Sequence, residues 1–170
     1  GMRKHIVFPT LLLFLLASCE ENNVDTPTAG SPPIAGYPRL SVYSINVDSI
    51  LATAGAYQIV VDIRVNVTDP DGREDIQSVE TQVFRPSASS PFLTQRLQDA
   101  GTLPDSTPGD GTFSGSVSFT TTRAQTGVYR LRIEARDVNN LKSTRTECIL
   151  FISRNNASTS LITQSLIAPD

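Results

Sequence analysis

Aspartates recur in three turn-rich stretches of this chain, where their carboxylate oxygens could bind a hard cation. The stretches carry Asp69, Asp71 and Asp75, then Asp99, Asp105 and Asp110, then Asp137 with Asn139 and Asn140. Calcium takes about six to eight oxygen ligands, which carboxylates and carbonyls supply. We therefore take calcium as the one candidate cofactor, with the ligand set Asp69, Asp71, Asp99, Asp105, Asp110 and Asp137. The alternative stays open, because Asp, Asn and Gly are also ordinary turn formers and no stretch follows EF-hand spacing.

A second candidate site is a row of four arginines in the C-terminal third of the chain: Arg130, Arg132, Arg136 and Arg145. The first three alternate with apolar residues, so they project from one face of a strand. Neighbouring guanidinium groups can hold a carboxylate or sulfate, as on an acidic polysaccharide. The alternative is a solvated, self-paired sheet face, since Glu134 and Glu147 offer cross-strand partners.

The third chemical feature is Cys19, which ends the run Leu16-Ala17-Ser18-Cys19. A basic start and an apolar run of 11 residues, 6–16, precede it. A membrane-spanning helix needs about 20 residues, so this run fits the core of a signal peptide. The four residues resemble the lipobox of bacterial lipoproteins, which implies that 1–18 is a signal peptide and that Cys19 is lipidated. An ordinary secretory leader, cut after Ala17 or Ser18, is the alternative.

The residues after Cys19 bear on where the anchor is placed. Glu20-Glu21-Asn22-Asn23 resembles an export signal that some Gram-negative bacteria use for surface lipoproteins. A solvated start of a linker would also suit acidic residues. We expect a lipid-anchored protein of the outer membrane, facing either the cell surface or the periplasm.

Composition after removal of this leader argues against several functions. The chain's single histidine, His5, lies in the leader, so catalysis by a Ser-His-Asp or Cys-His arrangement and an imidazole zinc site are not expected. Loss of Arg3 and Lys4 leaves 12 basic against 17 acidic residues, a net charge of −5, which disfavours nucleic-acid binding. Cys148 is left without a cysteine partner and is expected to be a buried, inert thiol. Paired carboxylates could cleave a glycosidic bond, but a small sandwich offers little room for a substrate groove, so we expect no enzyme.

Alternating side chains predict the elements that would position these residues. In 57–67 the apolar residues fall on one face and polar residues on the other, with Val60 out of phase, as in a strand buried on one side. Similar alternation predicts seven strands at 40–48, 57–67, 77–85, 92–98, 113–120, 128–137 and 143–152. In the first, a slip of phase between Val42 and Tyr43 fits a bulge.

The expected organisation has four parts: a signal peptide at 1–18, a flexible linker at 19–38, a β-sandwich at 39–153, and a polar tail at 154–170 that is either unstructured or adds one strand. The fold class is all-β, a single seven-stranded antiparallel sandwich. If strand direction alternates, the three aspartate-bearing loops share one end of it.

The run Gly127-Val128-Tyr129-Arg130-Leu131-Arg132-Ile133-Glu134-Ala135-Arg136-Asp137 resembles the F strand of immunoglobulin-like and fibronectin type III-like bacterial surface modules. The loop run 97–113 is also similar to such modules. The resemblance implies a tyrosine corner, in which the Tyr129 hydroxyl bonds to backbone near the preceding turn. The missing tryptophan and cysteine pair depart from antibody-type domains.

These features together predict a non-enzymatic cell-envelope lipoprotein that serves as a binding or assembly module. Its expected partners are the membrane, through the lipid, and an envelope protein or polysaccharide. The alternative is a carbohydrate-binding accessory lipoprotein of an outer-membrane glycan-handling system.

Overall fold

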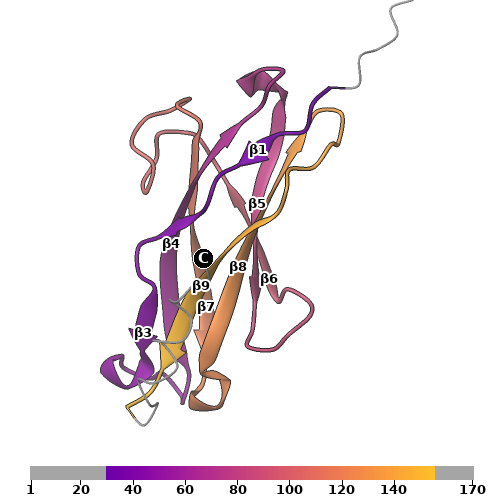
Figure 1. Cartoon of the computed structure of the whole chain (residues 1–170). Coiled ribbons are helices and arrows are strands. Elements are labelled where there is room, and N and C mark those ends of the chain that lie inside the picture. Colours follow the sequence, from indigo (N-terminus) through magenta and orange to yellow (C-terminus); the bar gives the residue numbers. More distant parts are fainter. Residues whose placement is uncertain (1–29, 156–170) are drawn as a thin grey trace, which may run out of the picture.

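The computed structural model describes residues 30–155, whose regular structure is β-strand apart from three short 3₁₀ helices (Figure 1). The predicted signal peptide, Cys19, residues 20–29 and residues 156–170 lie outside the described residues. The strands are β1 Ile34–Ala35, β2 Arg39–Leu40, β3 Ser44–Asn46, β4 Tyr57–Thr68, β5 Ile76–Phe84, β6 Leu93–Leu97, β7 Thr112–Thr121, β8 Gly127–Asp137 and β9 Thr146–Ser153. The 3₁₀ helices are η1 Val47–Ser49, η2 Arg73–Asp75 and η3 Arg123–Gln125.

The strands form two sheets. In the first, β4 is central, with β7 along one side and the short strands β1 and β2 along the other. The second sheet has the order β3-β9-β8-β5-β6. Most neighbours are antiparallel, but β3 runs parallel to β9.

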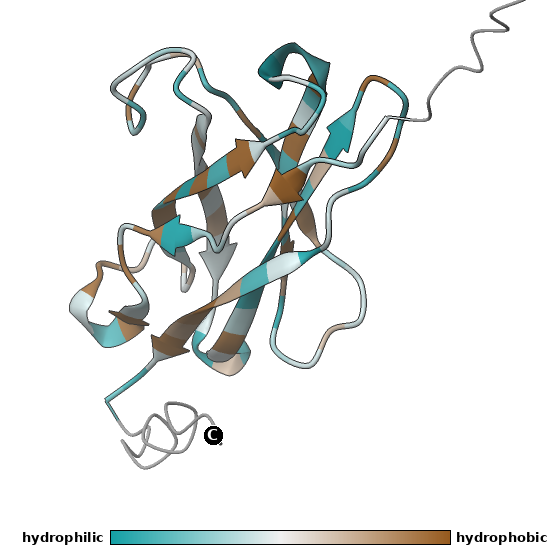
Figure 2. Cartoon of the chain, turned by 45° about the horizontal axis from the view of Figure 1, so that its top comes forward, coloured by the Kyte–Doolittle hydropathy of each residue, from teal (hydrophilic) through white to brown (hydrophobic). Residues whose placement is uncertain are grey.

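One hydrophobic core lies between the two sheets. In β4, residues Ile59, Val61 and Ile63 are at most 1% exposed, whereas the intervening Val60 is 57% exposed. The second sheet contributes residues such as Leu131 and Ile133 of β8 to the same cluster. Bands of hydrophobic and hydrophilic colour accordingly alternate along the strands in Figure 2. The alternation predicted for this segment is therefore present, and Val60 faces outward as its position in the sequence requires.

The first predicted strand, 40–48, is wrong as a single element. The chain forms β2 on the first sheet and then crosses to the second sheet as β3 and η1. The phase slip at Val42 and Tyr43 marks this crossing and not a bulge. The two halves lie on different sheets because β2 pairs with β4 and β3 pairs with β9.

Three further differences concern strand number, direction and boundaries. The described chain has nine strands, not seven, and the parallel pair β3–β9 makes the second sheet mixed. β1 lies within the predicted linker 19–38, and its Ala35 is part of the core, so the folded domain begins before residue 39. The last strand starts at Thr146 and not at 143.

The three aspartate-bearing loops do lie at one end of the domain. Asn66 pairs with Thr112 and Ile76 with Asp137, which brings the ends of β4 and β8 next to the starts of β7 and β5. We name this end the loop pole and define it by residues 69–75, 98–111 and 138–145. At the other end, Asn155 donates its backbone N–H to Asp48 of η1 at 2.9 Å. The described chain thus enters at one pole and leaves at the other (Figure 1).

Among residues 30–155, no helix has the length and apolar character that a membrane crossing requires.

Candidate functional sites

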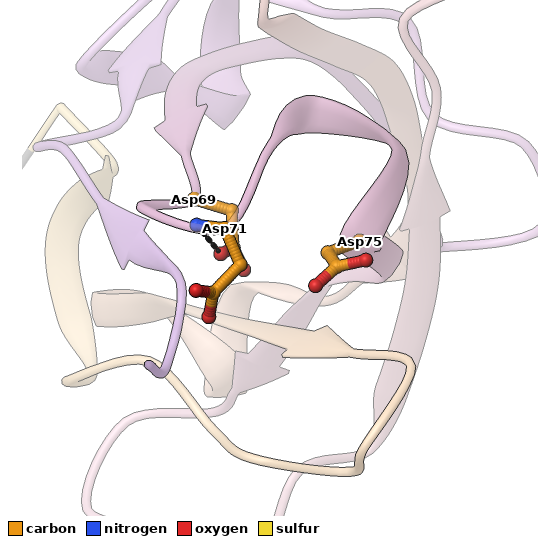
Figure 3. Close-up of side chains that lie close together, drawn as sticks. All are labelled: Asp69, Asp71 and Asp75. Atoms are coloured by element: carbon orange, nitrogen blue, oxygen red, sulfur yellow. Dashed lines mark hydrogen bonds between the residues drawn. The ribbon is translucent and has the colours of Figure 1, made fainter. Parts of the chain in front are cut away.

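Three carboxylates meet at the loop pole. Asp69, Asp71 and Asp75 each have an oxygen within 4.8 Å of the other two. Asp69 and Asp71 come from the turn after β4, and Asp75 from η2, which faces them across the loop (Figure 3). This spacing is suitable for a single cation held between all three side chains.

The turn that carries this group is built by its own side chains. Asp69 accepts a hydrogen bond from the Asp71 N–H at 2.9 Å, and its carbonyl accepts one from Gly72 at 3.2 Å. Gly72 has φ of 122°, a region that residues with a Cβ seldom adopt. The glycine is therefore required for the tight return that brings η2 back toward the turn.

Asp137 ends β8 beside this group and is fully buried. Its Oδ1 accepts the Leu141 N–H at 2.7 Å, but its Oδ2 has no hydrogen-bond partner among the residues that the structure describes. A Cβ built on Gly30 would lie 3.8 Å from that oxygen and 2.9 Å from Asp71 Oδ2, so both carboxylates lie beside Gly30. Asp69 Oδ2 is a second buried oxygen without a partner.

The electrostatics of the group are those of crowded negative charge. Burial raises the pKa of Asp75, and the neighbouring carboxylates of Asp69, Asp71, Asp137 and Glu74 raise it further. Each of these groups disfavours ionisation of Asp75, whereas a cation among them would favour it. The arrangement can therefore bind a proton or a metal ion.

The predicted ligands Asp99, Asp105 and Asp110 lie outside the group formed by Asp69, Asp71 and Asp75. Asp99 accepts hydrogen bonds from the N–H groups of Gly109 and Gly111 and pairs with Arg73 at 2.7 Å. Burial opposes the charge of Asp99, but these hydrogen bonds lower its pKa. The Asp99 carboxylate therefore stabilises the loop 98–111.

Asp105 and Asp110 serve the same loop. Asp105 is buried and accepts the N–H groups of Gly101 and Thr107, and Asp110 accepts that of Thr112 at 2.7 Å. These are the turn-forming roles that the sequence left open as the alternative for every aspartate. Asp75, which the candidate set omitted, takes part instead, because η2 turns it back toward Asp69 and Asp71.

The four arginines of the candidate clamp each lie beside a glutamate. Arg130 and Arg132 are 3.8 and 3.4 Å from Glu147, and their guanidinium groups stack on the Phe84 ring. On the same face, Arg136 and Arg145 lie 2.9 and 3.3 Å from Glu134, which Lys142 also contacts. Burial opposes the charge of Glu134, but Lys142 and Arg145 lower its pKa. The geometry of this face is that of a self-paired sheet surface.

An open groove of about 740 Å³ lies on the outer side of the first sheet, and sequence reasoning missed it. Its walls include Tyr37 and Tyr43, which are 84% and 52% exposed, together with Arg39, Arg64 and Asn66. Tyr37 fell within the predicted linker, which hid its place beside β4. The signal that could have revealed the groove was two tyrosines flanking an arginine within 37–43, in a chain with four tyrosines.

Cys148 lies on β9 and is partly buried. Burial, together with the adjacent Glu147 carboxylate, raises the pKa of its thiol to about 12. The thiol is therefore protonated at neutral pH, and a thiol in that state is a poor nucleophile.

The chain was compared with family models, curated proteins and solved structures. No protein-family model and no curated protein matches the chain. Among solved structures, the chain is similar to the PKD domain of an M14-like peptidase from Thermoplasmatales archaeon SCGC AB-540-F20. The match has 15% sequence identity, covers 73% of this chain and 98% of that one, and has a TM-score of 0.38. At this TM-score the likeness carries no conclusion about function.

Proposed function

We propose that this chain is a non-enzymatic lipoprotein of the bacterial cell envelope, in which an immunoglobulin-like sandwich binds or assembles with a partner at the membrane surface. The observation that carries the proposal is the run Leu16-Ala17-Ser18-Cys19, placed after a basic start and an apolar segment. Acylation of Cys19 with more than one chain gives stable anchoring, because each buried methylene adds roughly 0.8 kcal/mol of membrane affinity. The anchor is in the outer membrane, with the domain on the cell surface or in the periplasm.

The tyrosine corner supports the immunoglobulin-like assignment. Tyr129 donates its hydroxyl to the Gln125 carbonyl at 2.7 Å, just before β8, as the resemblance of 127–137 to an F strand implies. The crossing of the chain from β2 in one sheet to β3 in the other ties the two layers together at their edge.

The path of the chain bears on which end of the domain lies nearer the proposed lipid anchor. Residue 30 lies at the loop pole, and the ten residues between Cys19 and residue 30 let the two lie at most about 40 Å apart. An acylated Cys19 would therefore attach within that reach of the loop pole, while the η1 end lies at the opposite end of the domain. The partner is an envelope protein or a polysaccharide and not nucleic acid, given the net charge of −5 after processing.

Metabolic labelling with radioactive palmitate tests the anchor. The parent chain should incorporate label and sediment with membranes, whereas Cys19→Ala should do neither. Cys148→Ala is the matched control, because it removes the other cysteine and should keep both properties. Label in Cys19→Ala, or an unlabelled parent, would refute the proposal.

The groove favours one second candidate function, a carbohydrate-binding accessory lipoprotein. Exposed tyrosine rings suit stacking on sugar faces, and Arg39, Arg64 and Asn66 offer donors for sugar carboxylates and hydroxyls. Unlike the arginines on β8, Arg39 and Arg64 have no salt bridge among the described residues. The ligand class that fits is an acidic polysaccharide.

Affinity electrophoresis through gels containing an acidic polysaccharide separates the two candidates. A glycan binder should be retarded, and Tyr37→Ala should lose most of the retardation. The control is Leu51→Ala, which removes a side chain that is 93% exposed and lies outside the groove. Free migration of the parent in every gel would exclude this second function and leave the assembly role.

A further inference from the structure

We propose that the loop pole holds a calcium site formed by Asp69, Asp71, Asp75 and Asp137, and that the bound ion fastens the entering segment Gly30–Ser31 to this pole. The proposal is independent of the function proposed above. Three of the carboxylates already lie within 4.8 Å of one another. The fourth, Asp137, lies outside that group at the end of β8, and its Oδ2 and Asp71 Oδ2 both face Gly30 (Figure 3 shows the first three).

Two buried oxygens without partners point to a ligand at this place. Asp69 Oδ2 and Asp137 Oδ2 accept no hydrogen bond from any residue in the described range 30–155, although Asp137 is wholly buried. A buried carboxylate oxygen with no partner costs free energy, because nothing replaces its hydration. A cation between the carboxylates would coordinate both oxygens and remove that cost.

The donor set selects calcium. All four side chains offer carboxylate oxygen, the ligand that hard cations prefer. Zinc prefers nitrogen and sulfur, while magnesium demands a compact octahedron and keeps most of its waters. Calcium tolerates irregular loops that supply several carboxylates.

The entering segment is already seated on these carboxylates. Ser31 donates its backbone N–H to Asp71 Oδ2, and Gly30 packs so closely that a Cβ would lie 2.9 Å from that oxygen and 3.1 Å from the Asn139 side-chain nitrogen. An ion that fixes Asp71 therefore also fixes the place where the chain leaves the linker. Calcium would then set how freely the domain moves on its tether.

Thermal unfolding of the full chain gives the first test, in chelator, in millimolar calcium chloride and in millimolar magnesium chloride. Free calcium at about a hundred times the Kd of the site should raise the Tm by roughly 10 °C. Magnesium at the same concentration should raise it much less. Equal Tm values in chelator and calcium would overturn the proposal in favour of a proton shared among the carboxylates. Equal rises of the Tm in calcium and magnesium would also overturn the proposal, because they would indicate general screening of the negative charges and not a calcium site.

Isothermal titration with calcium chloride then identifies the ligands. The parent should bind one ion, and Asp75→Asn and Asp137→Asn should each weaken binding about tenfold or more, since affinity depends on the number of charged ligands. Asp75 is only partly buried, so its variant remains informative if Asp137→Asn fails to fold. Asp110→Asn is the matched control, because it changes an aspartate at the same pole that lies outside the site. Parent-like binding by Asp75→Asn, or weakened binding by Asp110→Asn alone, would overturn the assignment.

Hydrogen exchange tests the fastening of the segment. Exchange of the Ser31 amide should slow at least tenfold when calcium is added to the parent and should not change in Asp75→Asn. If calcium binds but exchange at Ser31 does not slow, the metal site stands and the proposed fastening of Gly30–Ser31 is wrong.

Discussion

Tyr129 shows how a single side chain closes one end of this fold. Its ring is buried between Phe119, stacked at 5.3 Å, and Phe92, edge-on at 6.2 Å. Its hydroxyl lies 2.7 Å from the Gln125 carbonyl and 2.8 Å from Thr121 Oγ1. The residue thereby joins the end of β7, the turn through η3 and the start of β8.

We expect Tyr129→Phe to lower the free energy of unfolding by about 1–2 kcal/mol, because the buried Gln125 and Thr121 oxygens lose a partner while the ring packing stays. Urea denaturation measures the change. Tyr37→Phe, at a side chain that is 84% exposed, is the control and should stay within about 0.5 kcal/mol of the parent. Equal stability of Tyr129→Phe and the parent would show that the hydroxyl is not structural.

The lowered pKa of Glu134 predicts that the domain loses folding stability in acid. The pKa of this carboxyl is lowered by Lys142, Arg145 and Arg136, against the effect of burial, so the unfolded chain binds a proton at a higher pH than the folded one. Its contribution to stability is thus present above the ordinary value of 4.5 and is lost as the pH falls through the lower folded pKa. Asp99, whose pKa is also lowered, acts in the same direction.

Stability curves in urea at a series of pH values test this response. The parent should lose stability steadily below about pH 4.5, and Glu134→Gln should be less stable near neutrality but show a flatter loss in acid. Parallel curves for the two proteins would contradict the role given to Glu134.

Residue types alone could not assign the aspartates at the loop pole. The sequence predicted that three loops would meet, because strand direction alternates. It did not distinguish a ligand from a turn former, since that depends on which backbone N–H groups each carboxylate reaches. The Asp99 carboxylate accepts the N–H groups of Gly109 and Gly111, whereas Asp137 Oδ2 accepts no hydrogen bond from a described residue.

At the scale of elements, β4 is the strand around which the first sheet is built. It pairs with β7 over ten positions, from Tyr57 with Thr121 to Asn66 with Thr112, and with β1 and β2 on its other edge. Its register decides which side chains enter the core, because a slip of one residue would exchange the two faces.

A pair of substitutions on β4 tests that register. Ile63 is fully buried and Val60 is 57% exposed, so Ile63→Ala should cost about 2–4 kcal/mol of unfolding free energy and Val60→Ala about 0.5 kcal/mol or less. Chemical denaturation measures both. Similar costs at the two positions would mean that the strand faces are assigned incorrectly.

Strong strands were predictable and short edge strands were not. Continuous alternation in 57–67 and 128–137 reflects burial on one face along the whole strand, a property that the local sequence encodes. β1, β2 and β3 have two or three residues each, too few for a period to show. Whether such a segment joins one sheet or the other depends on β4 and β9, which lie far away in the sequence.

At the scale of the whole molecule, the chain runs from one pole to the other. It enters beside the carboxylates of the loop pole and leaves beside Asp48, whose pKa is lowered chiefly by the backbone N–H of Asn155. An anchor at Cys19 would attach the chain beside the acidic pole and leave the η1 end farthest from the point of attachment. The proposed role at the membrane surface depends on that anchor, whereas the proposed calcium site does not.

Intact mass spectrometry of the protein purified from bacterial membranes tests the anchor most directly. The proposed processing predicts a chain that begins at Cys19, lacks residues 1–18, and carries diacylglycerol on the Cys19 sulfur. A membrane-extracted chain that keeps residues 1–18, or one that begins elsewhere with an unmodified Cys19, would contradict it.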